Sequence, residues 1–211
     1  LSEPLEWDDA ARYDRGKVLD AEQLEQREVF GRYLDVDGDG IGYRTLPGTH
    51  PEKGAFFTRG TSRDEFAAYT ESPEAYERNM QRLELKWQTI RSLVPKAEVA
   101  SQGQRIGVLF YGTTALPMPE AVDLLQGDGI ALDSCRVRAF PFGAEVESFV
   151  QDHEIVFVVE QNRDAQMRTL LINELQTDPA KLVPVLYYAG LSISADTIYP
   201  VSYTHLTLPT N

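Results

Sequence analysis

The second half of the chain alternates short apolar runs with helical patterns, and this alternation restricts the fold more than any other feature. The runs are rich in Val, Ile, Leu and Phe and end at Gly, Pro or charged residues, which predicts buried strands. They span residues 106–112, 132–140, 154–160 and 182–188. Helical patterns lie between them, at residues 117–125, 145–150 and 164–175. Strands that alternate with helices predict βαβ units, so the stretch from Arg105 to about Gly190 is expected to form a small α/β domain with a mainly parallel, four-stranded sheet.

The sequence before residue 105 predicts a long helix and much irregular structure. Ser72 is a candidate N-cap with Pro73 at the first helical position, and the helix is expected to continue to about Leu93. Its apolar residues recur every three or four positions and form one stripe: Tyr76, Met80, Leu83, Trp87 and Ile90. We therefore expect a loop-rich segment at residues 1–71, with one short helix from Ala21 to about Arg27 capped by Asp20, and a linking helix and linker at residues 72–104.

Composition excludes several classes of function. The formal net charge is −13, and an acidic surface disfavours nucleic acid as a partner. No apolar run is long enough for a membrane helix, and no secretory signal is recognisable, so a cytoplasmic protein is expected. The single cysteine, Cys135, cannot form an internal disulfide or supply a metal cluster, and it is expected to be a small buried hydrophobic residue.

The acidic segment Asp35-Val-Asp-Gly-Asp-Gly40 resembles the first half of a calcium-binding loop. Asp35, Asp37 and Asp39 alternate and a glycine follows, as such a loop requires. The second half does not match, because Leu46 stands where a bidentate Glu is needed. The favoured interpretation is a turn with solvated carboxylates, and these three residues are only a weak metal candidate.

The loop-like segment 48–64 has the side chains best suited to binding an anion. Guanidinium, ammonium and hydroxyl groups bind carboxylates and phosphates. The candidate residues near substrate or at an interface are His50, Lys53, Thr58, Arg59 and Arg63. From the residues alone, an anion site and an interdomain or intersubunit loop held by salt bridges are equally supported.

Other polar positions of the second half predict structural roles. The turn Gly112-Thr113-Thr114 lacks a G-x-G-x-x-G pattern, so NAD is not expected. The segment 160–164 follows a predicted strand, and Asn162 or Asp164 is expected to cap the next helix, with an interface role as a further possibility. His153 is interpreted as a strand-edge residue.

Several ordered motifs together resemble one family. They are residues 35–45, Pro47-Gly-Thr-His-Pro51, Phe57-Thr-Arg-Gly-Thr-Ser-Arg-Asp64, Asn79-Met-Gln-Arg-Leu83, Arg136-Val-Arg-Ala-Phe-Pro-Phe142 and residues 158–167. In this order they resemble the alpha subunit of 2-oxoacid:ferredoxin oxidoreductases, with the nearest likeness to the 2-oxoglutarate type (2-oxoglutarate synthase). The resemblance extends over about residues 1–199.

The resemblance implies oxidative decarboxylation of 2-oxoglutarate with coenzyme A to give succinyl-CoA. It implies thiamine diphosphate, Mg²⁺ and an iron–sulfur cluster in the complex, with a beta subunit and ferredoxin as partners in an alpha2beta2 hetero-oligomer. The Tyr-Pro-Ile-Thr-Pro and Pro-Ser-Thr-Gly motifs of the family do not occur in this sequence. The chain is therefore expected to be a C-terminal part of the subunit that is inactive alone, with no catalytic residues of its own. It would comprise the tail of a pyrimidine-binding α/β domain at residues 1–71, then the linking helix and linker. The last part, residues 105–199, would be a Rossmann-like C-terminal domain similar to the transketolase C-terminal domain.

Two alternatives stay open at this point. The α/β domain could be a non-catalytic module for dimerisation or docking, or the enzyme could be a paralogue that acts on pyruvate or a branched-chain oxoacid. Residues 200–211 have no counterpart in the family and resemble translated sequencing-adapter sequence, so native sequence is expected to end near Tyr199 and His205 is left out of the interpretation.

Overall fold

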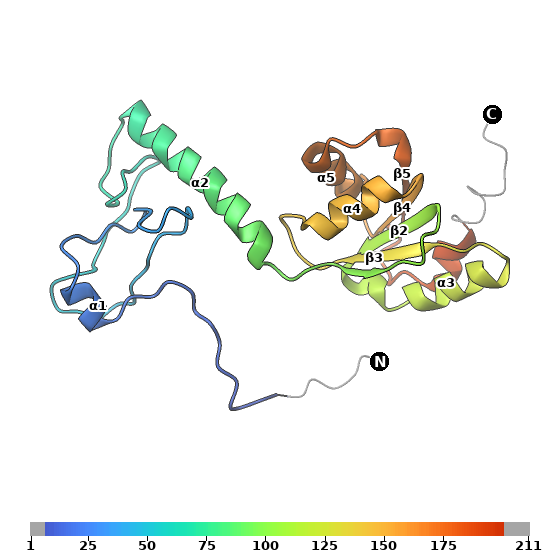
Figure 1. Cartoon of the computed structure of the whole chain (residues 1–211), viewed down its shortest axis with the longest axis horizontal. Helices are drawn as coiled ribbons and strands as arrows, with labels where there is room; N and C mark the ends of the chain where they lie inside the picture. The colour runs from blue at the N-terminus through green and yellow to red at the C-terminus, as the bar shows by residue number, and fades with distance from the viewer. Residues whose placement is uncertain (1–6, 201–211) are drawn as a thin grey trace. The chain divides into compact units, whose positions relative to one another are not determined.

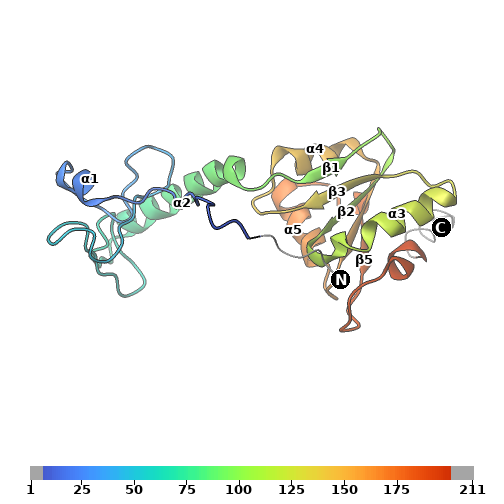
Figure 2. The ribbon, with the colours of Figure 1, turned by 90° about the horizontal axis from the view of Figure 1, so that it is seen from below.

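A computed structural model describes residues 7–200, and the chain divides into two compact units between Ile90 and Arg91 (Figure 1). The first unit is dominated by loops, whereas the second contains one β-sheet with helices on both faces (Figure 2). The adapter-like stretch expected at residues 200–211 lies, apart from Pro200, outside the described residues. Among the described residues, no helix has the length and apolar character needed to cross a membrane.

The sheet of the second unit confirms the expected α/β fold class. Its strands are β1 (Glu98–Ala100), β2 (Ile106–Tyr111), β3 (Asp133–Val137), β4 (Ile155–Glu160) and β5 (Leu182–Leu186). The order is β1-β3-β2-β4-β5, with β3, β2, β4 and β5 all parallel. These four are the predicted strands. The antiparallel edge strand β1 is additional, because residues 98–100 lie in the segment predicted to be linker.

Alternate residues of the strands build two apolar layers, as expected of a sheet covered on both faces. Leu109 and Val158 face helices α4 (Ala144–Asp152) and α5 (Gln166–Leu175), with Phe149 and Leu171 in the same cluster. On the other face, Phe157 and its neighbours pack on α3 (Met118–Gly127) and on the segment that contains Ile193, Ala195 and Ile198. Cys135 is fully buried in the first layer, and burial raises the pKa of its thiol to about 12, so the prediction of an inert hydrophobic residue is confirmed.

The two helices of the first unit begin as predicted. Helix α1 (Ala21–Glu25) follows Asp20, whose carboxylate accepts a hydrogen bond from Gln23 N while the Gln23 side chain bonds back to Asp20 N. Helix α2 (Pro73–Leu93) follows Ser72, whose hydroxyl oxygen accepts from Ala75 N. Tyr76, Met80 and Trp87 of the predicted apolar stripe remain about half exposed.

The acidic loop packs directly on α2. Gly40 has a φ of +75°, and a Cβ atom there would lie 2.4 Å from Lys86 N and 2.6 Å from Arg82 O. Thr89 Oγ1 donates to Asp39 O at 2.7 Å, and Arg82 Nη1 donates to Gly40 O at 2.9 Å. This close approach of backbone to backbone requires glycine at position 40.

Candidate functional site

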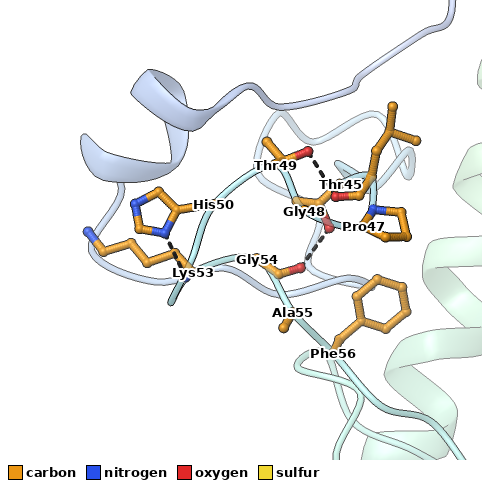
Figure 3. A pocket seen from close by; sticks show the side chains of 10 residues that line it. Thr45, Pro47, Gly48, Thr49, His50, Lys53, Gly54, Ala55 and Phe56 are labelled. Atoms are coloured by element: carbon orange, nitrogen blue, oxygen red, sulfur yellow. Dashed lines mark hydrogen bonds between the residues drawn. The ribbon is translucent and has the colours of Figure 1, made fainter.

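A pocket of about 320 Å³ is formed by residues 45–50 and 53–56 (Figure 3). The loop folds back on itself because Thr45 Oγ1 donates to Gly54 O at 2.6 Å and Thr49 Oγ1 donates to Leu46 O at 2.8 Å. Gly48 and Gly54 both have a positive φ, of +80° and +81°. These two glycines let the loop reverse direction, so a wall of backbone and short side chains surrounds the opening.

The sequence candidates His50 and Lys53 lie together in this pocket, beside Glu25 of α1. His50 Nδ1 accepts hydrogen bonds from Lys53 N at 2.8 Å and Glu52 N at 3.1 Å, so a neutral ring carries its proton on Nε2. That atom lies 3.4 Å from Glu25 Oε2, and Lys53 Nζ lies 2.7 Å from the same oxygen. The hydrogen bond and charge of Lys53 hold the pKa of Glu25 below its ordinary value. The imidazole N–H and the ammonium group at the edge of the pocket therefore already bind one carboxylate, that of Glu25.

The other three candidates of this segment do not line the pocket. Arg63 Nη1 donates to the Tyr33 hydroxyl at 3.3 Å and Nη2 donates to Gly60 O at 3.1 Å, which fixes the guanidinium against its own loop. Thr58 is half-buried and Arg59 is exposed. Within residues 7–200, Arg59 makes no ion pair. Its charge is thus available to a ligand or partner at the surface.

The three aspartates of the calcium-like loop have other partners. The Asp35 carboxylate accepts hydrogen bonds from Gly38 N, Asp39 N and Gly40 N. Lys17 Nζ lies 2.6 Å from Asp37 Oδ2 and 2.7 Å from Asp39 Oδ2, so an ammonium group stands where a metal ion would be expected. Between residues 7 and 200, no three His, Cys, Asp or Glu side chains are grouped so that they could hold a metal. The sequence could not reveal Lys17 as the partner, because it lies twenty positions upstream.

The carboxyl ends of β2 and β4 lie side by side, at the point where the sheet order changes direction. Glu160 at the end of β4 is fully buried and accepts from Met167 N at 2.8 Å and Arg168 N at 3.2 Å, the first turn of α5. Asn162 Oδ1 accepts from Gln166 N at 3.2 Å, which agrees with a capping role. Asp164 instead pairs with Arg163. Glu160 lies in the segment 160–164 noted in the sequence, but capping was expected of Asn162 or Asp164 rather than of Glu160.

The prediction that His153 is a strand-edge residue is wrong. Its ring is buried at the end of α4, with Nδ1 2.6 Å from Phe149 O and Nε2 3.2 Å from the buried carboxylate of Asp133. The same carboxylate accepts from Ser101 and from Gln102 N at 2.8 Å, so it joins β3 to the turn before β2. Burial raises the pKa of Asp133, but the hydrogen bonds from Gln102, Ser101, Gln104 and His153 outweigh it and hold the pKa below its ordinary value.

Comparison with known proteins gives one curated relative with clear sequence similarity. It is subunit alpha of 2-oxoacid:ferredoxin oxidoreductase 2 from Aeropyrum pernix, 31% identical over 163 residues. The matched region is 74% of this chain and 24% of that subunit, so the chain spans about a quarter of the relative's length. No family model matches the sequence.

A solved structure shares the fold. The 2-oxoglutarate:ferredoxin oxidoreductase from Magnetococcus marinus, determined with 2-oxoglutarate, coenzyme A and succinyl-CoA bound, superposes with a TM-score of 0.74 at 21% identity. The superposition covers 87% of this chain and 32% of that one. At this identity the likeness concerns the fold. The curated relative and the shared fold together show that the chain is similar to part of the alpha subunit of 2-oxoacid:ferredoxin oxidoreductases.

Proposed function

We propose that this chain is part of the alpha subunit of a 2-oxoglutarate:ferredoxin oxidoreductase. In the reaction, 2-oxoglutarate loses CO₂, its acyl group forms a thioester with coenzyme A, and two electrons pass to ferredoxin. The observation that carries the proposal is the 31% identity over 163 residues to an alpha subunit of this class. The choice of 2-oxoglutarate is supported by the motifs at residues 35–64 and by the fold shared with a 2-oxoglutarate enzyme.

The described residues do not themselves fit the cofactors of such an enzyme. A cluster held by four thiolates cannot be built from Cys135 alone, and this thiol is buried with a raised pKa. Residues 7–200 contain no group of three or more His, Cys, Asp or Glu side chains that could hold a metal ion. We therefore assign thiamine diphosphate, Mg²⁺ and the cluster to a beta subunit and to other parts of the alpha subunit, and no chemical step to this stretch alone.

The role proposed for this stretch is to line the substrate entrance or the subunit contact. His50 and Lys53 contribute to the lining of one pocket, and Thr58 and Arg59 follow on the same loop. Arg63 anchors the loop base through Tyr33 and Gly60. Cationic groups at an entrance would attract a dicarboxylate substrate, which an otherwise acidic chain of net charge −13 would repel.

The test is to purify the complete alpha subunit with the protein that copurifies with it, and to measure ferredoxin reduction. We expect reduction that requires coenzyme A and a 2-oxoacid, with kcat/KM highest for 2-oxoglutarate. Higher kcat/KM with pyruvate or a branched-chain oxoacid would keep the enzyme class and replace the substrate. A stable complex with no thiamine, no cluster and no activity would favour the alternative, a non-catalytic docking module.

A further inference from the structure

A second pocket of the first unit, of about 310 Å³, is lined by positive charge. Segments 15–17, 32–33 and 41–44 form its walls with the middle of α2. The lining contains no carboxylate and six cationic side chains: Arg15, Lys17, Arg32, Arg44, Arg82 and Lys86. This concentration is notable in a chain with 33 acidic and only 20 basic residues.

Five of these six cations form no ion pair within the part of the chain that the structure describes. Lys17 is paired with Asp37 and Asp39. The other five form no ion pair with any residue from 7 to 200. Elsewhere in the same unit, Arg78 is paired with Glu65 and Lys53 with Glu25. Unpaired like charges that face one cavity repel one another, and a bound anion would remove that cost.

Arg82 is the most deeply placed of the five. Its Nη1 donates a hydrogen bond to Gly40 O, but its Nε is buried and has no hydrogen-bond partner among the described residues. Burial and the nearby charge of Arg32 lower the pKa of Arg82, and they outweigh the opposing effect of the Asp35 carboxylate. A buried N–H group without an acceptor is costly, and a ligand oxygen in the pocket is one way to satisfy it.

The aromatic ring of Tyr33 holds the guanidinium groups in place. Arg32 lies 5.5 Å from the ring centroid, Arg82 5.8 Å and Arg63 5.6 Å. Guanidinium groups that stack on a ring keep their N–H edges free for an anion. The walls are also fixed, because Arg44 N donates to Lys17 O at 2.9 Å and Leu19 N donates to Arg44 O at 2.9 Å. The pocket is therefore formed before any ligand binds.

We propose that this pocket, formed around Arg82, Arg32 and Lys86, is a binding site for the phosphate or diphosphate group of a small molecule. Five unpaired cations exceed what a single carboxylate can neutralise, whereas a diphosphate carries several charges and enough acceptor oxygens for paired N–H donors. A volume of about 310 Å³ is enough for such a group. The proposal does not depend on which oxoacid is used.

The test is calorimetric titration of the 211-residue chain with inorganic pyrophosphate at low ionic strength. The double variant Arg15→Gln/Lys86→Gln removes two exposed or half-exposed pocket charges that make no ion pair within the described residues. The control Arg12→Gln/Lys96→Gln removes the same kinds of charge at exposed positions outside the pocket. Because the pocket variant loses charge-assisted hydrogen bonds, we expect its Kd for pyrophosphate to rise about tenfold or more. The Kd of the control should stay within about twofold of the wild-type value.

A second variant and a second ligand keep the result decisive. Arg82→Lys retains the charge and removes the planar fork, so it should also weaken binding while circular dichroism stays unchanged. ADP serves as a phosphoester probe: tighter binding of ADP than of pyrophosphate identifies a small organic phosphate, and the reverse identifies free inorganic anion. The proposal is overturned if pyrophosphate gives no heat, if both double variants lose affinity equally, or if 2-oxoglutarate binds as tightly as pyrophosphate.

Discussion

The imidazole Nε2 of His153 lies 3.2 Å from the Asp133 carboxylate, and both side chains are almost completely buried. Because Phe149 O can only accept, the Nδ1 atom of His153 is the donor in their 2.6 Å hydrogen bond. Asp133 also receives the N–H groups of Gln102 and Gln104. The carboxylate thus joins α4, β3 and the turn that leads into β2.

Asp133→Asn should lower the free energy of unfolding by about 3 kcal/mol, because an amide cannot accept every hydrogen bond that the buried carboxylate accepts. Urea denaturation followed by circular dichroism measures the change. Glu154→Gln is the control, since it breaks an exposed ion pair with Arg105 and should be close to wild type. Equal destabilisation by both variants would contradict a special role for Asp133.

The Asp133 carboxylate should also make the free energy of unfolding depend on pH in the acidic range. The pKa of Asp133 is lower in the folded chain than its ordinary value of 3.8, so its contribution is fully present above that value and is lost as pH falls through the lower, folded-state pKa. The stability difference between wild type and Asp133→Asn should therefore shrink below about pH 4. A difference that stays constant from neutral pH to pH 2 would contradict this assignment.

Gly40→Ala should destabilise the first unit by about 3 kcal/mol, since the new methyl group would meet the backbone of Lys86 and Arg82 at a positive φ. Gly38→Ala is a matched control. Its φ of +72° is similar, but no atom lies within 4 Å of the added Cβ, so only the backbone cost of about 1 kcal/mol is expected. Denaturation curves of the two variants separate packing from backbone strain.

Lys17→Met should lower the melting temperature, and the loss should be smaller at high salt because the ion pairs with Asp37 and Asp39 are partly exposed. Calcium titration of the wild type should give no heat at millimolar metal. Calcium binding by the wild type as tight as that of a complete calcium loop would contradict the structural role of Lys17.

In the complete enzyme, Lys53→Ala and Arg59→Ala should each reduce kcat/KM for the oxoacid about tenfold, mainly through KM, if these cations attract the substrate. Arg78→Ala, which loses only an exposed ion pair with Glu65, is the control. Size-exclusion chromatography separates an effect on catalysis from one on assembly. Wild-type kinetics together with wild-type assembly would remove both residues from the proposed site.

The sheet was predictable because its signal is local. Runs such as residues 154–160 are apolar on both faces, and only a buried strand of a parallel sheet fits that pattern. Strand β1 escaped prediction because its three exposed residues carry no such pattern, and pairing with β3 alone makes it a strand. Whether a short edge strand forms therefore depends on its tertiary contacts, whereas a central strand can be predicted from the composition of its own segment.

The loop contacts were predictable only in part. The residue types of the segment 48–64 indicate anion binding, and the structure brings His50 and Lys53 together. The ion-pair partners of these side chains are distant in sequence: Lys53 pairs with Glu25, and Asp37 pairs with Lys17. The basic pocket could not be predicted for the same reason, since Arg15 and Lys86 lie on segments far apart in the chain. Charge clusters of this kind have no signature in local sequence.

Lys17 acts toward the acidic loop as a counterion that is covalently tethered to the protein. Because this counterion is part of the chain, the loop is expected to keep its shape in the presence of chelators and at any calcium concentration. The loop in turn positions Gly40 against α2. The segment 41–44, which follows Gly40 directly, lines the basic pocket, so the ion pairs of Lys17 help to position one wall of that pocket.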